Sequence, residues 1–178
     1  MKPAFLVEGV TEQKFIQLVC GGHPVKIINC NGSSVVVGAI AKRAASLIRL
    51  WGGKFFPIII VVDREDRCES ANDFAHGLAQ AIREEGVCDS VVIGVADRMI
   101  ENWMVADPLL WPDHTTPQSV DGLNGLSILR QRLPAYNKSV DGAALLKRSR
   151  SREIASRSAS FKRLKDQLEI MRCNWLRG

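Results

Sequence analysis

The sequence lacks the marks of several large classes of protein. Its five cysteines are scattered and include no CxxC pair, so we expect no disulfide framework and a reducing, cytoplasmic setting. The longest apolar run, residues 57–62, is far too short to cross a bilayer, and the N-terminus does not resemble a signal peptide. The sequence therefore predicts a cytoplasmic protein that does not enter a membrane.

Aromatic residues are also few, at 6% of the chain. The four tryptophans stand isolated, so a platform on which bases stack is not expected. Tyr136 is the only tyrosine and lies in a proline-flanked loop, where we expect a structural and not a catalytic role. Cys20 and His23 have no second pair of ligands at a suitable spacing, so we expect no zinc site there.

The residues that are present favour a folded and unevenly charged chain. A hydrophobic content of 46% in 178 residues is enough for a core, in one domain or one domain with an appendage. Residues 1–127 hold 11 Lys and Arg against 15 Asp and Glu, a balance of −4, and residues 128–178 hold 13 against 4, a balance of +9. This split suits an enzyme that holds a metal and grips a polyanion, although a solvated helical surface would give the same count.

The hydrophobic pattern alternates between strand and helix. We expect strands at residues 4–7, 25–28, 55–62 and 90–95, with helices at 11–19, 35–50 and 74–85 between them. This alternation predicts an α/β fold with a four-stranded parallel sheet flanked by helices. We expect residues 1–107 to form the core, and residues 108–178 to form an irregular loop and a basic helical C-terminal appendage packed on it.

The C-terminal region is expected to contain several helices. A short helix is predicted at residues 100–106, followed by an irregular stretch at 107–125 that is rich in Pro, Thr, Asp and Gly. Further helices are predicted at 126–133, 139–150 and 158–176, the last with an apolar stripe of Phe161, Leu164, Leu168, Ile170 and Met171.

Acidic residues follow three of the predicted strands. Glu8 follows the first, Asp63 with Glu65 and Asp66 follows the third, and Glu101 follows the fourth. In an open parallel sheet these strand ends form one crevice, which is the usual ligand site. Like charges about 4 Å apart repel by about 4 kcal/mol at an effective dielectric of about 20, and a hard divalent cation removes that cost. Any one of these residues could be a solvated loop residue, but their coincidence favours a functional site.

The same segments resemble a known family. Residues 7–12, Val-Glu-Gly-Val-Thr-Glu, resemble the first motif of the Toprim superfamily, an apolar strand running into EGxTE, and residues 63–66 resemble its second, an Asp-x-Asp type cluster. Residues 100–104, Ile-Glu-Asn-Trp-Met, resemble a Glu-x-Trp helix of small stand-alone bacterial Toprim-like proteins of unassigned function. Residues 136–138 and 158–161 are similar to C-terminal landmarks of those proteins.

The Toprim resemblance, which extends to OLD-family nucleases, implies a Mg²⁺- or Mn²⁺-dependent nuclease acting on DNA or RNA. It implies catalytic roles for Glu8, Asp63 and Glu101. It implies metal ligands among Glu8, Glu12, Asp63, Glu65, Asp66 and Glu101. Because Glu65 stands where the family has a second aspartate, the sequence leaves open whether Glu65 or Asp66 completes the motif. Glu12 could instead be a favourable charge in a first helical turn.

Basic residues of the tail are candidates to contact nucleic acid. They are Lys138, Lys147, Arg148, Arg150 and Arg152. The resemblance to stand-alone Toprim-like proteins also implies an ATPase partner and a role in phage defence, which no single residue indicates.

Other functions fit less well. A topoisomerase needs a large DNA gate and a primase needs template-binding modules, and 178 residues leave no room for either. A phosphoacceptor receiver domain needs an acidic pair after its first strand and a lysine after a fifth, and the sequence has neither. The alternative that remains is a catalytically idle Toprim-like module that binds nucleic acid or a partner ATPase.

Overall fold

The sheet is parallel, as the sequence predicts. The computed structural model describes residues 1–30, 32–113, 115–168 and 173–177. Its strands are β1 (Lys2–Val7), β2 (Val25–Ile27), β3 (Phe55–Asp63) and β4 (Val91–Ala96), and they form one four-stranded sheet in the order β2-β1-β3-β4. Every pairing is parallel, so the carboxyl ends of all four strands lie at one edge.

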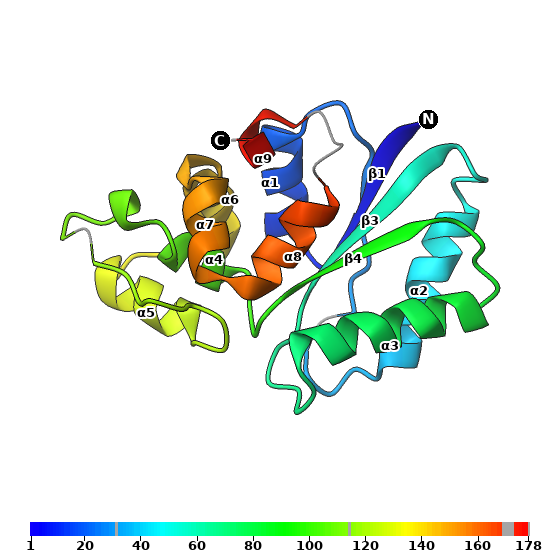
Figure 1. Cartoon of the computed structure of the whole chain (residues 1–178), viewed down its shortest axis with the longest axis horizontal. Coiled ribbons are helices and arrows are strands. Elements are labelled where there is room, and N and C mark those ends of the chain that lie inside the picture. The colour runs from blue at the N-terminus through cyan, green and yellow to red at the C-terminus, as the bar shows by residue number, and fades with distance from the viewer. Residues whose placement is uncertain (31, 114, 169–172, 178) are drawn as a thin grey trace.

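Helices cover both faces of this sheet (Figure 1). Alternate residues of β3 point to opposite sides, with Ile58 and Ile60 in one hydrophobic cluster and Ile59 and Val61 in the other. The first cluster includes side chains of α2 (Val37–Arg49) and α3 (Ala71–Glu84), and the second includes side chains of α1 (Val10–Val19) and α8 (Ala159–Gln167). Burial on both faces explains why β3 is an uninterrupted apolar run.

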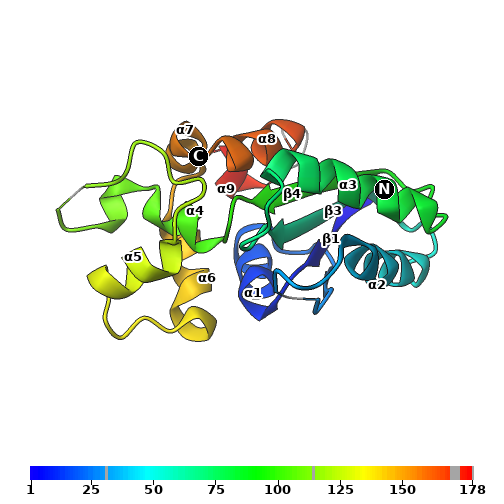
Figure 2. The ribbon, with the colours of Figure 1, turned by 90° about the horizontal axis from the view of Figure 1, so that it is seen from below.

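Most of the remaining helices lie beyond the carboxyl ends of the strands (Figures 1 and 2). They are α4 (Glu101–Val105), the 3₁₀ turn η1 (Pro108–Leu110), α5 (Gly125–Arg132), α6 (Lys138–Arg148) and α7 (Ser151–Arg157). Helix α6 packs against α1, and α8 packs against β4. The described residues after position 107 thus contribute to the same core as the sheet.

Two C-terminal helices differ from the prediction. The helix expected at 139–150 ends at Arg148, because buried Asp107 accepts hydrogen bonds from the backbone and guanidinium of Arg150 and holds that residue in an extended conformation. The helix expected at 158–176 ends at Gln167, and α9 (Asn174–Arg177) follows separately. Ile170 and Met171 of the expected stripe lie outside the described residues. None of the helices in the described part of the chain is long and apolar enough to cross a membrane.

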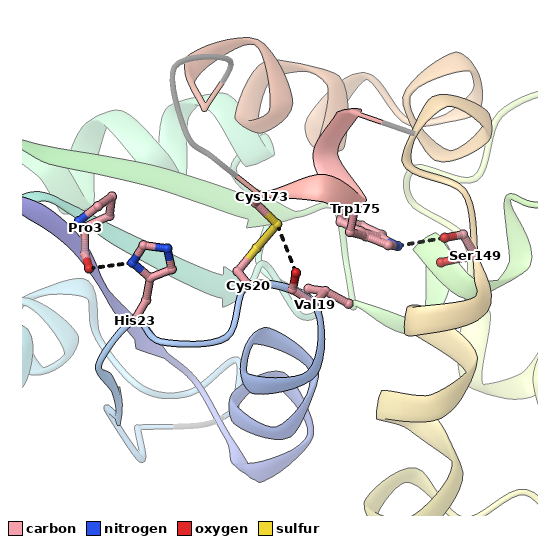
Figure 3. The surroundings of a disulfide bond; sticks show 7 residues. All are labelled: Pro3, Val19, Cys20, His23, Ser149, Cys173 and Trp175. Carbon is pink, nitrogen blue, oxygen red and sulfur yellow. Dashed lines mark hydrogen bonds between the residues drawn. A yellow bond between two sulfur atoms is a disulfide. The ribbon is translucent and has the colours of Figure 1, made fainter.

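The expectation that the cysteines stay unpaired is wrong for two of them. Cys20, at the end of α1, forms a disulfide with Cys173, just before α9 (Figure 3). The two are 153 residues apart, and only the packing of the C-terminal segment beside α1 brings them together, so their sequence spacing gives no signal. Nδ1 of nearby His23 lies 3.2 Å from the carbonyl oxygen of Pro3.

Candidate functional site

The site forms at the carboxyl edge of the sheet. Glu8 directly follows β1, and Asp63 is the last residue of β3, the neighbouring strand. Glu101 opens α4, shortly after β4 ends at Ala96. All three side chains are buried, with exposed fractions between 1% and 8%. The structure therefore brings together the three carboxylates that the strand ends predict.

Backbone amides hold two of these carboxylates. The Asp63 N–H donates to Oε2 of Glu8 at 2.6 Å, and the Ile100 N–H donates to Oδ1 of Asp63 at 2.9 Å. Each carboxylate is thereby fixed through one oxygen, and the second oxygen of Asp63 lies 3.9 Å from the ammonium of Lys138.

Glu12 joins the site from the first turn of α1. Its Oε2 accepts a hydrogen bond from the backbone N–H of Gly9 at 3.0 Å, so the residue also caps its own helix. The close approach explains the glycine, since a Cβ at position 9 would lie 3.1 Å from that same oxygen. The structure therefore supports both interpretations of Glu12. Its carboxylate caps the start of α1, and it also belongs to the acidic cluster.

Lys138 begins α6, and its ammonium lies among the carboxylates. Its Nζ is 3.2 Å from Oε1 and 3.4 Å from Oε2 of Glu101. The same nitrogen is 3.8 Å from Oε1 of Glu12 and 3.9 Å from Oδ2 of Asp63. Carboxylates from three different elements thus converge on one positive charge.

The backbone around Lys138 is anchored to α1. The carbonyl oxygen of Lys138 accepts a hydrogen bond from the Thr11 hydroxyl at 3.2 Å. Gly142 permits the close packing of α6, because a Cβ there would lie 2.8 Å from Cγ2 of Thr11 and 3.2 Å from the Tyr136 hydroxyl. Tyr136 is buried and its hydroxyl donates to the sulfur of Met104 at 3.6 Å, which gives it the structural role that the sequence predicts.

Burial and charge shift the pKa values of the cluster. Burial raises the pKa of Glu8 to about 7, against the opposing effect of the hydrogen bond from Asp63. Burial also raises the pKa of Asp63, and the neighbouring Glu8 raises it further. Burial acts to lower the pKa of Lys138, but the surrounding carboxylates outweigh it and raise that pKa. Lys138 thus lowers the pKa values of Glu8 and Asp63, but burial outweighs its effect.

The carboxylate oxygens of the site are ligands that a hard divalent cation prefers. They do not lie at metal–ligand distances from a common point. Among the described residues, no three acidic, histidine or cysteine side chains stand close enough together to hold a metal ion. The oxygens surround Nζ of Lys138 at 3.2–3.9 Å, whereas Mg²⁺ and Ca²⁺ bind oxygen at roughly 2.0–2.6 Å. Oε1 of Glu101 is buried and accepts no hydrogen bond in the described part of the chain, and its only cationic neighbour there is the Lys138 ammonium at 3.2 Å.

Glu65 and Asp66, the two candidates for the second position of the motif, lie in different surroundings. The side chain of Asp66 is 69% exposed and pairs with Arg98 at 2.8 Å. Glu65 has a left-handed backbone with φ of 59°, and its charge contributes to raising the pKa of Glu8. This difference favours Glu65 as the residue beside the cluster.

The basic residues predicted to contact nucleic acid also differ in their surroundings. Lys147, Arg148 and Arg152 are exposed, as a nucleic-acid contact requires. Arg150 instead pairs with Asp107, with Nη2 2.7 Å from Oδ1 and Nε 3.0 Å from Oδ2. Asp107 is 1% exposed, so this pair holds the start of α7 in place.

Three residues that the sequence did not single out hold the loops around the site. Arg64 donates to Oδ1 of Asp97 at 2.6 Å, which ties the loop after β3 to the loop after β4. The Asn102 side chain donates to the Asp97 carbonyl at 2.8 Å and accepts from the Gly125 N–H at 2.8 Å. The only signal in the sequence was a second polar residue, Asn102, between Glu101 and the apolar remainder of a short helix.

Comparison with known proteins adds no assignment. A scan against protein-family models, a search of curated proteins and a search of solved structures gave no significant match to this chain. The functional argument therefore rests on the residues of the site.

Proposed function

We propose that this protein is a divalent-metal-dependent nuclease of the Toprim type, which hydrolyses phosphodiester bonds of DNA or RNA. The observation that carries the proposal is the gathering of Glu8, Glu12, Asp63 and Glu101, all buried, at the carboxyl edge of a parallel sheet. Buried carboxylates in such number are unfavourable unless a cation compensates them. Lys138 alone leaves excess negative charge, which Mg²⁺ or Mn²⁺ would neutralise.

Each residue has a distinct part in this proposal. Asp63, Glu101 and Glu12 would hold the cation, which when bound supplies Lewis acidity toward the phosphate and activation of water. Glu8, with a pKa of about 7, is suited to accept a proton from the attacking water near neutral pH. The exposed Lys147, Arg148 and Arg152 would contact the phosphate backbone with little dependence on sequence.

The setting is also part of the proposal. We keep a cytoplasmic location as part of the proposal, although the cysteine argument for it fails for the Cys20–Cys173 pair. The Toprim resemblance supports an ATPase partner and a role in phage defence. Neither partner nor pathway is needed for the chemistry of the site itself.

One observation favours a second candidate, a catalytically idle module that binds nucleic acid or a partner protein. Lys138 already contacts three of the carboxylates, so the cluster could be a structural ion network without a metal. This candidate predicts binding without cleavage.

A cleavage assay separates the two. Labelled single- and double-stranded DNA and RNA are incubated with the protein in Mg²⁺, in Mn²⁺ and in chelator. We expect cleavage only with metal, a loss of roughly 10²-fold or more in Glu8→Gln, and substrate binding within a few-fold of wild type. Glu69→Gln is a matched control, since Glu69 is exposed in the loop after β3. Binding of nucleic acid with no cleavage under any metal condition would favour the idle module.

A further inference from the structure

The ammonium of Lys138 lies among the carboxylates of the site. It contacts Glu12, Asp63 and Glu101, each through an oxygen that no backbone amide occupies. These are the same three carboxylates that the proposed function assigns to a metal. Two cations within this small group of atoms would repel each other strongly, because both would lie within about 4 Å of the same carboxylates.

The side chain of Lys138 has more freedom to move than its backbone. Its carbonyl is bound by Thr11, and Asn137 caps the helix by accepting from the Ser139 N–H at 3.0 Å. The side chain, by contrast, is 41% exposed and is joined to the backbone by a flexible four-carbon stem. Its position at the start of α6 is unfavourable for a cation, because the N-terminus of a helix carries partial positive charge.

We propose that Lys138 is an exchangeable counter-ion: its ammonium holds the carboxylates in the metal-free protein, and a divalent cation displaces it into the solvent-facing mouth of the site. This inference rests on the proposed metal site and adds to it a device that sets metal affinity. Lys138 weakens metal binding by competing for the same ligands, and it prevents the carboxylates from dispersing when no metal is bound.

The first test measures Mn²⁺ affinity by titration calorimetry, without any substrate. Wild type is compared with Lys138→Met, Lys138→Arg and Lys147→Met, the last being the same substitution at an exposed lysine of the same helix. We expect the dissociation constant of Lys138→Met to be at least about tenfold lower than that of wild type. Lys138→Arg keeps the charge and should remain close to wild type, as should Lys147→Met.

The second test needs no variant. Lysines of the wild-type protein are acylated with and without Mn²⁺ and quantified by peptide mass spectrometry, with Lys147 as internal reference. We expect Lys138 to become at least about threefold more reactive when Mn²⁺ is bound. Equal Mn²⁺ affinity in wild type and Lys138→Met, or no gain in Lys138 reactivity at saturating Mn²⁺, would overturn the counter-ion role and leave the metal site intact. Absence of Mn²⁺ binding to wild type and to Lys138→Met alike would overturn the metal site, and the counter-ion role with it.

Discussion

Glu8 and Asp63 end neighbouring parallel strands, and the backbone N–H of Asp63 donates to the Glu8 carboxylate at 2.6 Å. The bond links the two acidic motifs of the sequence directly. It fixes one oxygen of Glu8 and leaves the carboxylate of Asp63 to accept from Ile100 and face Lys138. Substitution of Asp63 therefore tests metal binding, and substitution of Glu8 tests the dependence of stability on pH.

Asp63→Asn tests the metal. The amide keeps an oxygen to accept from the Ile100 N–H, so the fold should survive, but the charge that binds a cation is gone. We expect Mg²⁺ or Mn²⁺ to raise the melting temperature of wild type by mass action on the native state, and not that of Asp63→Asn. Asp66→Asn should respond like wild type, because Asp66 is exposed and paired with Arg98. If Asp66→Asn loses the response while Asp63→Asn keeps it, the metal site is assigned to the wrong residues.

The pKa of Glu8 predicts how stability depends on pH without metal. Because burial raises this pKa from 4.5 to about 7, the folded protein binds a proton between about pH 4.5 and 7 that the unfolded chain has released. The stability linked to this proton is present at low pH and is lost as the pH rises through 7. The raised pKa of Asp63 acts in the same direction.

In chelator, we therefore expect the free energy of unfolding to fall by up to about 3 kcal/mol between pH 5 and 8. Glu8→Gln keeps an acceptor for the Asp63 N–H but cannot titrate, so its dependence on pH should be flatter. Urea unfolding at several pH values measures this. An equally steep fall in Glu8→Gln would assign the pH dependence to other groups.

The sequence predicted the acidic half of the site well, for a simple physical reason. Strand ends are marked by the abrupt change from apolar to acidic residues, and parallel strands bring those ends to one edge. The positions of Glu8, Asp63 and Glu101 relative to the strands were therefore enough to predict that the three side chains meet, and all three are buried at that edge.

The basic half could not be predicted. Lys138 reaches the site because α6 packs on α1 through Thr11 and Gly142, a contact between segments more than 120 residues apart that no local pattern encodes. The break between α6 and α7 is likewise set by distant Asp107. One local hint existed at position 138. A lysine directly after the N-capping Asn137 lies near the positive end of the helix dipole, which is unfavourable unless nearby carboxylates compensate its charge.

The exposed basic residues lead to a prediction on salt dependence. If Lys147, Arg148 and Arg152 contact phosphates, the slope of log affinity against log salt on duplex DNA should flatten by about 0.9 for each contact removed. The triple alanine variant should therefore lose up to about 3 units of slope, as measured by fluorescence anisotropy at several salt concentrations. An unchanged slope would assign these residues to surface solubility.

Arg150 is left out of that variant because its guanidinium pairs with buried Asp107. Arg150→Ala should instead destabilise the fold by about 2 kcal/mol, because a buried carboxylate loses its charged partner. The exposed Arg152→Ala should stay within about 0.5 kcal/mol of wild type. The contrast between these two single variants, measured by urea unfolding, checks whether Arg150 belongs to the fold or to the binding surface.

The disulfide joins the C-terminal segment to the helix that carries Glu12. Next to Cys173, Trp175 packs edge-on against Phe15 of α1, with ring centroids 4.8 Å apart, and its indole donates to the Ser149 carbonyl at 2.7 Å (Figure 3). This segment therefore packs on the second half of α1. The disulfide restrains it in the folded state and restricts the unfolded chain.

Removal of the disulfide should therefore lower stability substantially. A cross-link that closes a loop of 153 residues reduces the entropy of the unfolded chain by an amount equivalent to about 5 kcal/mol, and measured losses are commonly about 2–5 kcal/mol. We expect Cys20→Ala with Cys173→Ala, or wild type in reductant, to unfold at clearly lower urea than oxidised wild type. Cys68→Ala with Cys88→Ala removes two exposed free thiols instead and should leave the midpoint unchanged. If reductant and the Cys20/Cys173 variant both leave the urea midpoint where it is, the covalent link does not stabilise this fold, and non-covalent packing is enough to hold the C-terminal segment on α1.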